Sequence, residues 1–125
     1  MTSTEEIVLA YIAAWTETDE GKRGALLEKS WAENGTYTDP TVEVVGREAL
    51  VQHIGSIHQR FAGHRILLTS GVDEHHGRLR FTWGMVSPEG SRVSEGIDFG
   101  EVGSDKRLIR ITGFFGSVSP IPNYM

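Results

Sequence analysis

The spacing of apolar residues changes near the middle of the chain. Up to Gly63, apolar side chains recur at helical spacing, so that Ile7, Tyr11 and Trp15 share one face. Beyond Gly63, four β-rich runs are separated by short clusters of turn-forming residues. The runs are residues 65–73, 78–87, 92–102 and 107–115. Connections this short join antiparallel neighbours. Helices followed by strands predict an α+β fold, with three N-terminal helices packed on one face of a curved antiparallel sheet.

The two later helices are separated by a short extended segment. The second helix carries Trp31 and ends at Asn34-Gly35, which is typical of a C-terminal cap. Residues 36–38 form a β-type segment that ends at Asp39-Pro40, because the residue before proline is disfavoured in the α region. The third helix opens near Gly46 and ends before Gly63. We therefore expect only a short strand ahead of the third helix.

Length, charge and cysteine content exclude several classes of protein. A chain of 125 residues fits one domain, residues 1–125, with an irregular tail over 117–125. The absence of cysteine excludes disulfides and thiolate catalysis, and a net charge of −5 disfavours nucleic-acid binding. No apolar run is long enough for a membrane span, and the N-terminus does not resemble a signal peptide. We expect a cytoplasmic protein without a nucleic-acid or membrane partner.

Alternation along the run 92–102 places a carboxylate between two glycines. Gly96, Asp98 and Gly100 share one face, whereas Val93, Ile97 and Phe99 occupy the other. Small neighbours leave volume above a strand, and here that volume would contain Asp98. Two interpretations stay open. Asp98 lies either on the solvent face, with the glycines as bulges, or in a cavity, with an apolar outer face that pairs with a second subunit.

Two further rows of apolar residues belong to the neighbouring runs. They are Phe81, Trp83 and Met85, and Ile109, Ile111 and Phe115. If these rows share a face with Asp98, they form an apolar pocket around one carboxyl group. Desolvation would then raise the pKa of that carboxyl and allow it to donate a hydrogen bond near pH 7. The alternative is that these side chains form an ordinary core.

Four stretches, together with the order of the predicted elements, carry a resemblance to a known family. They are residues 11–15 (Tyr-Ile-Ala-Ala-Trp), 37–40 (Tyr-Thr-Asp-Pro), 96–99 (Gly-Ile-Asp-Phe) and 113–116 (Gly-Phe-Phe-Gly). The chain resembles the nuclear-transport-factor-2-like superfamily, the cystatin-like cone of ketosteroid isomerases, SnoaL-like polyketide cyclases and scytalone dehydratases. The resemblance covers residues 5–116, and the SnoaL-like proteins look nearest. It implies that Asp98 points into the cone.

The resemblance to ketosteroid isomerases also implies roles for individual residues. Tyr11 stands where that family has its oxyanion-binding tyrosine, Asp39 where it has the catalytic base, and Asp98 where it has a protonated acid. Ile54 stands near the place of a supporting tyrosine, so Tyr11 lacks that partner. His53 occupies a pocket position where the isomerases carry an aromatic residue, and its imidazole could act as an acid or a base.

These assignments imply a cofactor-independent acid–base enzyme. It would be an isomerase or a cyclase that acts on a small hydrophobic carbonyl compound through an enolate. The expected substrate-binding residues are Trp15, Phe81, Trp83, Met85, Ile111 and Phe115. The alternative is a non-catalytic module of the same fold that binds a hydrophobic ligand or dimerises.

The remaining features indicate no cofactor and a second copy as partner. His75-His76 is interpreted as a solvated turn rather than a metal site, because adjacent side chains point apart and no third ligand is suitably spaced. His58 and His64 are expected at the surface. An inward Asp98 leaves Val93, Ile97 and Phe99 on the outer sheet face, which predicts a homodimer through that face.

Overall fold

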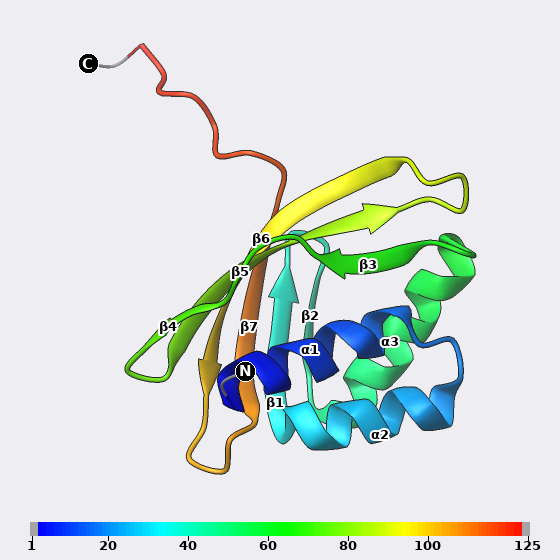
Figure 1. Cartoon of the computed structure of the whole chain (residues 1–125), viewed down its shortest axis with the longest axis vertical. Helices are drawn as coiled ribbons and strands as arrows, with labels where there is room; N and C mark the ends of the chain where they lie inside the picture. Colours follow the sequence, from blue (N-terminus) through cyan, green and yellow to red (C-terminus); the bar gives the residue numbers. More distant parts are fainter. Residues whose placement is uncertain (1–2, 124–125) are drawn as a thin grey trace.

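The computed structural model describes residues 3–123. These residues form three helices and seven strands, and Figure 1 shows the helices together on one side of a curved sheet. The predicted α+β fold is therefore confirmed. The elements are α1 (Ser3–Thr16), α2 (Glu20–Ser30), β1 (Trp31–Asp39), β2 (Val42–Val45), α3 (Arg47–Arg60), β3 (Arg65–Leu68), β4 (Asp73–His75), β5 (Arg78–Val86), β6 (Arg92–Val102) and β7 (Leu108–Phe115).

The sheet is mixed rather than purely antiparallel. Its strand order is β2-β1-β7-β6-β5-β3, and β4 also pairs with β5. The predicted antiparallel meander is present in β5, β6 and β7. However, β1 runs parallel to β7. A parallel pair requires a long connection, and here the chain between the two strands contains α3 and most of the sheet. This pairing brings the end of β1 beside the middle of β7.

The predicted second helix ends earlier than expected. It stops at Ser30, and Trp31 is the first residue of β1, with an extended backbone. Asn34-Gly35 lies inside β1, where the pairing with β7 is irregular. A Cβ at position 35 would lie 2.6 Å from Trp31 Nε1, so Gly35 admits the buried indole instead of capping a helix. The second strand, β2, was not predicted.

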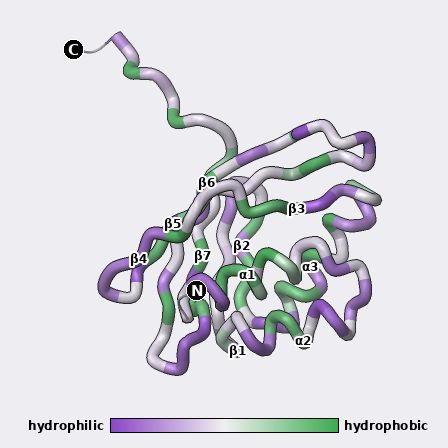
Figure 2. Tube along the Cα trace, in the orientation of Figure 1, coloured by the Kyte–Doolittle hydropathy of each residue, from purple (hydrophilic) through white to green (hydrophobic). Residues whose placement is uncertain are grey.

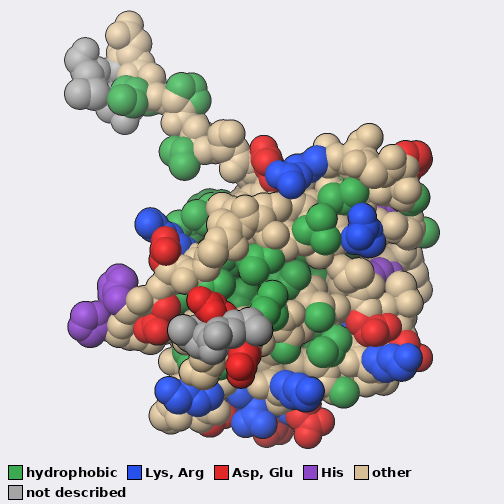
Figure 3. All heavy atoms as spheres, viewed as in Figure 1, with side chains coloured by type: hydrophobic (Ala, Val, Ile, Leu, Met, Phe, Trp, Pro, Cys, Tyr) green, Lys and Arg blue, Asp and Glu red, His purple; other side chains and the backbone are tan. Residues whose placement is uncertain are grey.

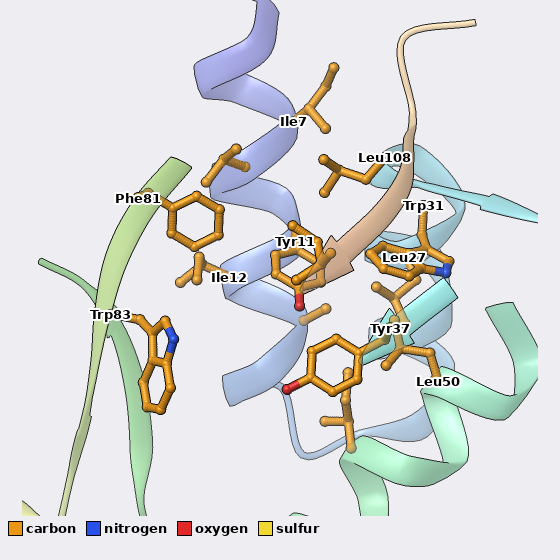
Figure 4. Close-up of a cluster of buried hydrophobic side chains, with 14 of the residues drawn as sticks. Ile7, Tyr11, Ile12, Leu27, Trp31, Tyr37, Leu50, Phe81, Trp83 and Leu108 are labelled. Carbon is orange, nitrogen blue, oxygen red and sulfur yellow. The ribbon is translucent and has the colours of Figure 1, made fainter. Parts of the chain in front are cut away.

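One hydrophobic core lies between the helices and the sheet. Figure 4 shows Tyr11 of α1 between Phe81 and Trp31, and its ring stacks on that of Trp31 with centroids 5.5 Å apart. Leu27 of α2 and Leu50 of α3 are also fully buried. Burying each large apolar side chain stabilises the fold by about 1.5–3 kcal/mol. In Figure 2 hydrophobic residues concentrate along α1 and α3, whereas hydrophilic residues gather at the turns. This packing fixes α1 across the sheet.

Polar contacts hold the ends of the helices. The buried Arg23 guanidinium donates to three backbone carbonyls, those of Glu17, Thr18 and Val51. The Thr16 hydroxyl donates to the Ile66 carbonyl and accepts from the Ile66 N–H, which attaches the end of α1 to β3. The three helices are therefore held to one another and to the sheet at the end of α1.

The C-terminal tail and the β4–β5 turn lie at the periphery of the molecule, as predicted. Residues 117–123 have no helix or strand and extend away from the body in Figures 1 and 3, while residues 124–125 of the predicted irregular tail lie outside the described part. His75 and His76 are exposed at the β4–β5 turn. No helix within residues 3–123 is long and apolar enough to cross a membrane.

Candidate functional site

A cavity of about 410 Å³ lies between the helices and the inner face of the sheet. Cavities of about 300–1,000 Å³ are typical of small-molecule sites. The walls are mainly aromatic and aliphatic side chains from α1, α3 and the strands. The polar side chains among them include Tyr11, Tyr37, Asp39, His53 and Asp98. The chain thus encloses a few polar groups in a largely apolar space.

The alternation along β6 places Asp98 inside. Asp98 is only 6% exposed, whereas the next residue, Phe99, is 43% exposed on the outer face. The interpretation of Asp98 as a solvent-facing residue is therefore wrong. Val93, expected on the outer face, is exposed but also contributes to the cavity wall. The β5–β6 pairing is irregular between Met85 and Val86, opposite this end of β6.

The two glycines beside Asp98 do not leave the empty volume that the sequence suggested. A Cβ at Gly96 would meet the Phe114 carbonyl oxygen and would lie 2.5 Å from Trp83 Cζ2. The space above Gly100 is filled by Ile111, whose Cδ1 would lie 2.8 Å from an added Cβ. Gly96 therefore admits the Trp83 indole, and Trp83 Nε1–H donates to Asp98 Oδ1 at 3.0 Å.

The environment of Asp98 favours its neutral form. Burial raises the pKa of this carboxyl from 3.8 to about 7, and the negative charge of Asp39 acts in the same direction. The hydrogen bond from Trp83 opposes the shift, because it stabilises the carboxylate. Near pH 7 a substantial fraction of Asp98 is protonated and can donate a hydrogen bond into the cavity.

Asp39, at the end of β1, is half-buried and held by three hydrogen bonds. Tyr37 Oη donates to Asp39 Oδ2 at 2.7 Å. The backbone N–H and the hydroxyl of Thr41 both donate to Oδ1, each at 2.7 Å. Tyr37 was not among the predicted site residues. The sequence did contain a signal for Tyr37, because it stands two positions before Asp39 and side chains two apart on a strand share a face. These donors orient the Asp39 carboxylate.

Gly113 of β7 separates the two carboxyl groups. A Cβ at this position would lie 2.8 Å from Asp98 Oδ1 and 3.7 Å from Asp39 Cβ. Asp98 pairs directly with Gly113 across β6 and β7, and Thr38 pairs with Thr112 across β1 and β7. Strand pairing therefore brings together two aspartates that are 59 positions apart in the sequence.

Tyr11 places a hydroxyl without a protein partner against the cavity. Its side chain is 1% exposed, and Oη has no hydrogen-bond partner within the described residues. Burial raises the pKa of Tyr11 well above 10 and the charge of Asp98 raises it further, while the nearby Trp15 side chain opposes the shift without reaching hydrogen-bond geometry. The phenol therefore stays protonated. A buried donor of this kind lacks a hydrogen bond until a ligand supplies the acceptor.

His53 of α3 lies beside the aromatic wall of the cavity. Its ring centroid is 5.9 Å from those of Trp15 and Tyr37. Partial burial lowers the pKa of His53 below 6.5, although the charge of Asp39 opposes this effect. The imidazole is therefore mainly neutral near pH 7. It can accept or donate one hydrogen bond there.

The apolar residues predicted to bind a substrate divide into two groups. Trp15, Trp83, Met85 and Phe115 contribute to the cavity wall. Phe81 and Ile111 are 1% and 0% exposed, belong to the core, and are not part of the wall. Ile109, which was placed in the same apolar row as Ile111 and Phe115 but not among the substrate-binding residues, is exposed and lies outside the cavity. Alternation predicts the face of a strand on which a residue lies, but not its depth beneath the helices.

Three residues near the end of α3 were not predicted as part of the site. Arg60, Phe61 and His64 all contribute to the cavity wall. The expectation that His64 is a surface residue is thus incomplete, because it is half-buried against this wall. His58 is also half-buried, and its Nε2 is shielded from solvent. No cluster of metal-ligating side chains is present within residues 3–123.

No family model and no curated protein matches the sequence, but solved structures do. A protein of the SnoaL-like family from Agrobacterium tumefaciens, described as a proposed isomerase, is 33% identical, with a TM-score of 0.87 over 94% of this chain and 100% of that chain. A proposed SnoaL-like polyketide cyclase from Jannaschia sp. is 13% identical, with a TM-score of 0.71 over 90% and 85% of the two chains. A cystatin-like protein of unknown function from Methylobium petroleophilum is 14% identical, with a TM-score of 0.75 over 98% and 80%. The last two show similarity of fold alone.

Proposed function

The chain belongs to the SnoaL-like family, and on this basis we propose that it is a cofactor-independent acid–base enzyme that isomerises a small, largely apolar carbonyl compound through an enolate. The observation that supports the proposal is the meeting of two carboxyl groups and a partnerless phenol in one apolar cavity. The description of the Agrobacterium protein as an isomerase agrees with this reaction. Ring closure, the reaction named for the Jannaschia protein, would begin with the same enolate.

Asp39 is the proposed base. Three donors orient its carboxylate, and Oδ2 accepts only from Tyr37, so this oxygen has an acceptor position left for a proton from a substrate. Removal of the proton next to the carbonyl leaves the electron pair delocalised onto the carbonyl oxygen. The resulting carboxylic acid then returns the proton to a different carbon. The double bond has moved, and Asp39 is again ionised.

Tyr11 and neutral Asp98 are the proposed donors to the enolate oxygen. Tyr11 is fixed by stacking on Trp31, so its hydroxyl is positioned before a substrate binds. Asp98 is held by Trp83 and is partly protonated near pH 7. Donors positioned in this way stabilise the negative charge that develops on the oxygen in the transition state. His53 is the proposed second acid–base group, beside Asp39.

The proposed function is tested by removing the base, Asp39. We expect Asp39→Asn to lower kcat for a panel of β,γ-unsaturated ketones by about 10²–10⁴-fold, because the amide cannot take the proton. Formation of the conjugated enone is followed by its ultraviolet absorbance. Asp73→Asn, which removes an exposed carboxylate of β4, is the matched control. Ketones that bind with no conversion, and with an affinity unchanged in Asp39→Asn, would instead indicate a non-catalytic binding module.

A homodimer through the outer sheet face is also part of the proposal. Phe99 and Phe114 are 43% and 54% exposed on neighbouring strands, and their ring centroids are 6.1 Å apart. Adjacent exposed aromatic rings of this kind are typical of a surface that is covered by a partner. A second copy would cover the rings with the same pair on its own sheet.

A further inference from the structure

The cavity carries opposite charges at its two ends. The aspartates lie where β1, β6 and β7 meet, on either side of Gly113. Arg60 and His64 contribute to the wall where α3 ends and β3 begins. Figure 1 shows this junction at the edge of the molecule, away from the centre of the sheet. The wall therefore changes from acidic to basic along α3.

The length of α3 sets the separation between the two ends. His53 contacts Tyr37, which is bonded to Asp39, and so marks the acidic end. Arg60 follows His53 by two turns on the same side of the helix, with Ile57 between them. At the helical rise this places Arg60 about 10 Å farther along α3. A ligand that reaches both ends must therefore have its two polar groups well separated.

Arg60 is held at the cavity without an anionic partner. Its guanidinium carbon lies 5.3 Å from the centroid of the Phe61 ring, which also contributes to the wall. The residue is exposed, and within residues 3–123 it forms no ion pair, as is also true of Arg65 and Arg78, whereas Arg80, Arg92, Arg107 and Arg110 each pair with a carboxylate. A guanidinium offers paired N–H donors that match the geometry of a carboxylate or phosphate. Arg60 thus presents unused donors beside the cavity.

The His64 ring lies next to Arg60, since both side chains contact the Phe61 ring. Its Nδ1 lies 3.1 Å from the Phe61 carbonyl oxygen and 3.2 Å from that of Ala62. Carbonyl oxygens only accept hydrogen bonds, so Nδ1 carries a proton in this arrangement. The Nε2 atom has no hydrogen-bond partner among the described residues. When the ring is protonated, Nε2 adds a positively charged donor to that of Arg60.

We infer that the substrate carries an anionic group, such as a carboxylate, which binds Arg60 and His64 while its enolisable carbonyl lies at Tyr11 and Asp98. This inference rests on the proposed function, whose donors define the other end of the ligand. The net charge of the chain is −5, so an anionic substrate needs local cations of this kind. With a neutral substrate, the N–H donors of Arg60 would be hydrogen-bonded only by water.

Two naphthols test the inference. 2-Naphthol is a stable enol with an apolar ring, and 6-hydroxy-2-naphthoate adds a carboxylate at the far end of the same ring. Affinities are measured by calorimetry near pH 6, where the hydroxyl is neutral and the carboxylate ionised. We expect the carboxylated ligand to bind at least ten-fold more tightly. Arg60→Gln and His64→Gln should each reduce this preference, and Arg65→Gln, an exposed neighbour, should retain it.

The outcomes separate the two proposals. Tyr11→Phe should weaken both naphthols, because it removes the donor to the enolic oxygen. If the two ligands bind equally, or if the preference for the carboxylated ligand survives Arg60→Gln, the inference of an anionic substrate is overturned while the proposed function stands. If Tyr11→Phe changes neither affinity, the proposed function is contradicted, and the effect of Arg60→Gln still decides the anion site. If neither ligand binds at millimolar concentration, both proposals fail.

Discussion

Asp98 and Phe99 are neighbours on β6, and their surroundings are opposite to what their chemistry favours. The carboxyl is 6% exposed beneath the helices, whereas the aromatic ring is 43% exposed on the outer face of the sheet. Burial of a carboxylate and exposure of a large apolar ring are both unfavourable in an isolated domain. Each residue is therefore better explained by what it meets outside the chain. We propose a ligand for the inner face and a second copy for the outer face.

The two faces also differ in how completely their groups are partnered. On the inner face Asp98 is bonded to Trp83, whereas the Tyr11 hydroxyl has no hydrogen-bond partner among residues 3–123. On the outer face Phe99 and Phe114 contact each other and solvent. The inner face is thus built around a specific polar group, and the outer face is a general apolar surface. Changes on the inner face should alter pH dependence and catalysis, and changes on the outer face should alter assembly.

The largest expected effect is on stability in Asp98→Asn. The pKa of Asp98 is about 7 in the folded chain and 3.8 ordinarily, so the folded state retains a proton that the unfolded state loses between these values. Stability is therefore lost as the pH rises from about 4 to 7. The neutral amide avoids this loss. We expect the free energy of unfolding of Asp98→Asn to exceed that of the wild type by up to about 4 kcal/mol at pH 8, and to differ little from it at pH 4.

Urea denaturation at the two pH values measures this difference. Asp73→Asn is the control for the change in net charge, since Asp73 is exposed. An Asp98→Asn variant with the same advantage at pH 4 as at pH 8 would show that burial does not suppress ionisation of Asp98.

A smaller effect is expected from Gly113→Ala. The added methyl group would lie 2.8 Å from Asp98 Oδ1, so it pushes apart the two carboxyl groups. Overpacking of this kind destabilises a protein by about 1–3 kcal/mol, and the conversion of ketones should fall as well. Thermal unfolding and the absorbance assay provide the measurements. Gly71→Ala, at a position with open space, should change neither.

On the outer face we expect Phe99→Lys to convert a dimer into a monomer. A charge in the centre of an apolar interface weakens association by about 2 kcal/mol or more, which is at least about 30-fold in Kd. Sedimentation at micromolar concentration measures the mass of the species, and ketone conversion reports whether the fold is intact. A wild-type chain that sediments at 13.8 kDa would contradict the dimer.

The smallest effect is on the pH profile. Because neutral Asp98 is the donor, kcat/KM should fall as the pH rises through about 7. Trp83→Phe removes a hydrogen bond that lowers this pKa, so the alkaline limb should move upward, to about 8. Phe115→Leu loosens the packing against Trp83 without removing the donor and should leave the limb in place. If the alkaline limb is unchanged in Trp83→Phe, the group that produces it is not Asp98.

Features that depend on local geometry could be predicted from the sequence. Alternation along β6 separated Asp98 from Phe99, and the apolar spacing between Gly46 and Gly63 predicted α3. Features that depend on the meeting of distant segments could not. Trp31 was assigned to a helix, because nothing in its neighbourhood shows that Gly35 makes room for its indole in β1. Phe81 was predicted to contact a substrate, because alternation does not reveal how deeply a strand residue is covered.

The local sequence pattern was therefore enough to indicate most of the order of elements and the two faces of β6, and the resemblance to a known family indicated the family. The pairing of β1 with β7 was not accessible in this way, and it is this pairing that brings Asp39 beside Gly113 and Asp98. Only packing revealed the position of Arg60 at the far end of the cavity. Periodicity depends on neighbouring residues, whereas a site depends on contacts between segments that are far apart in the chain.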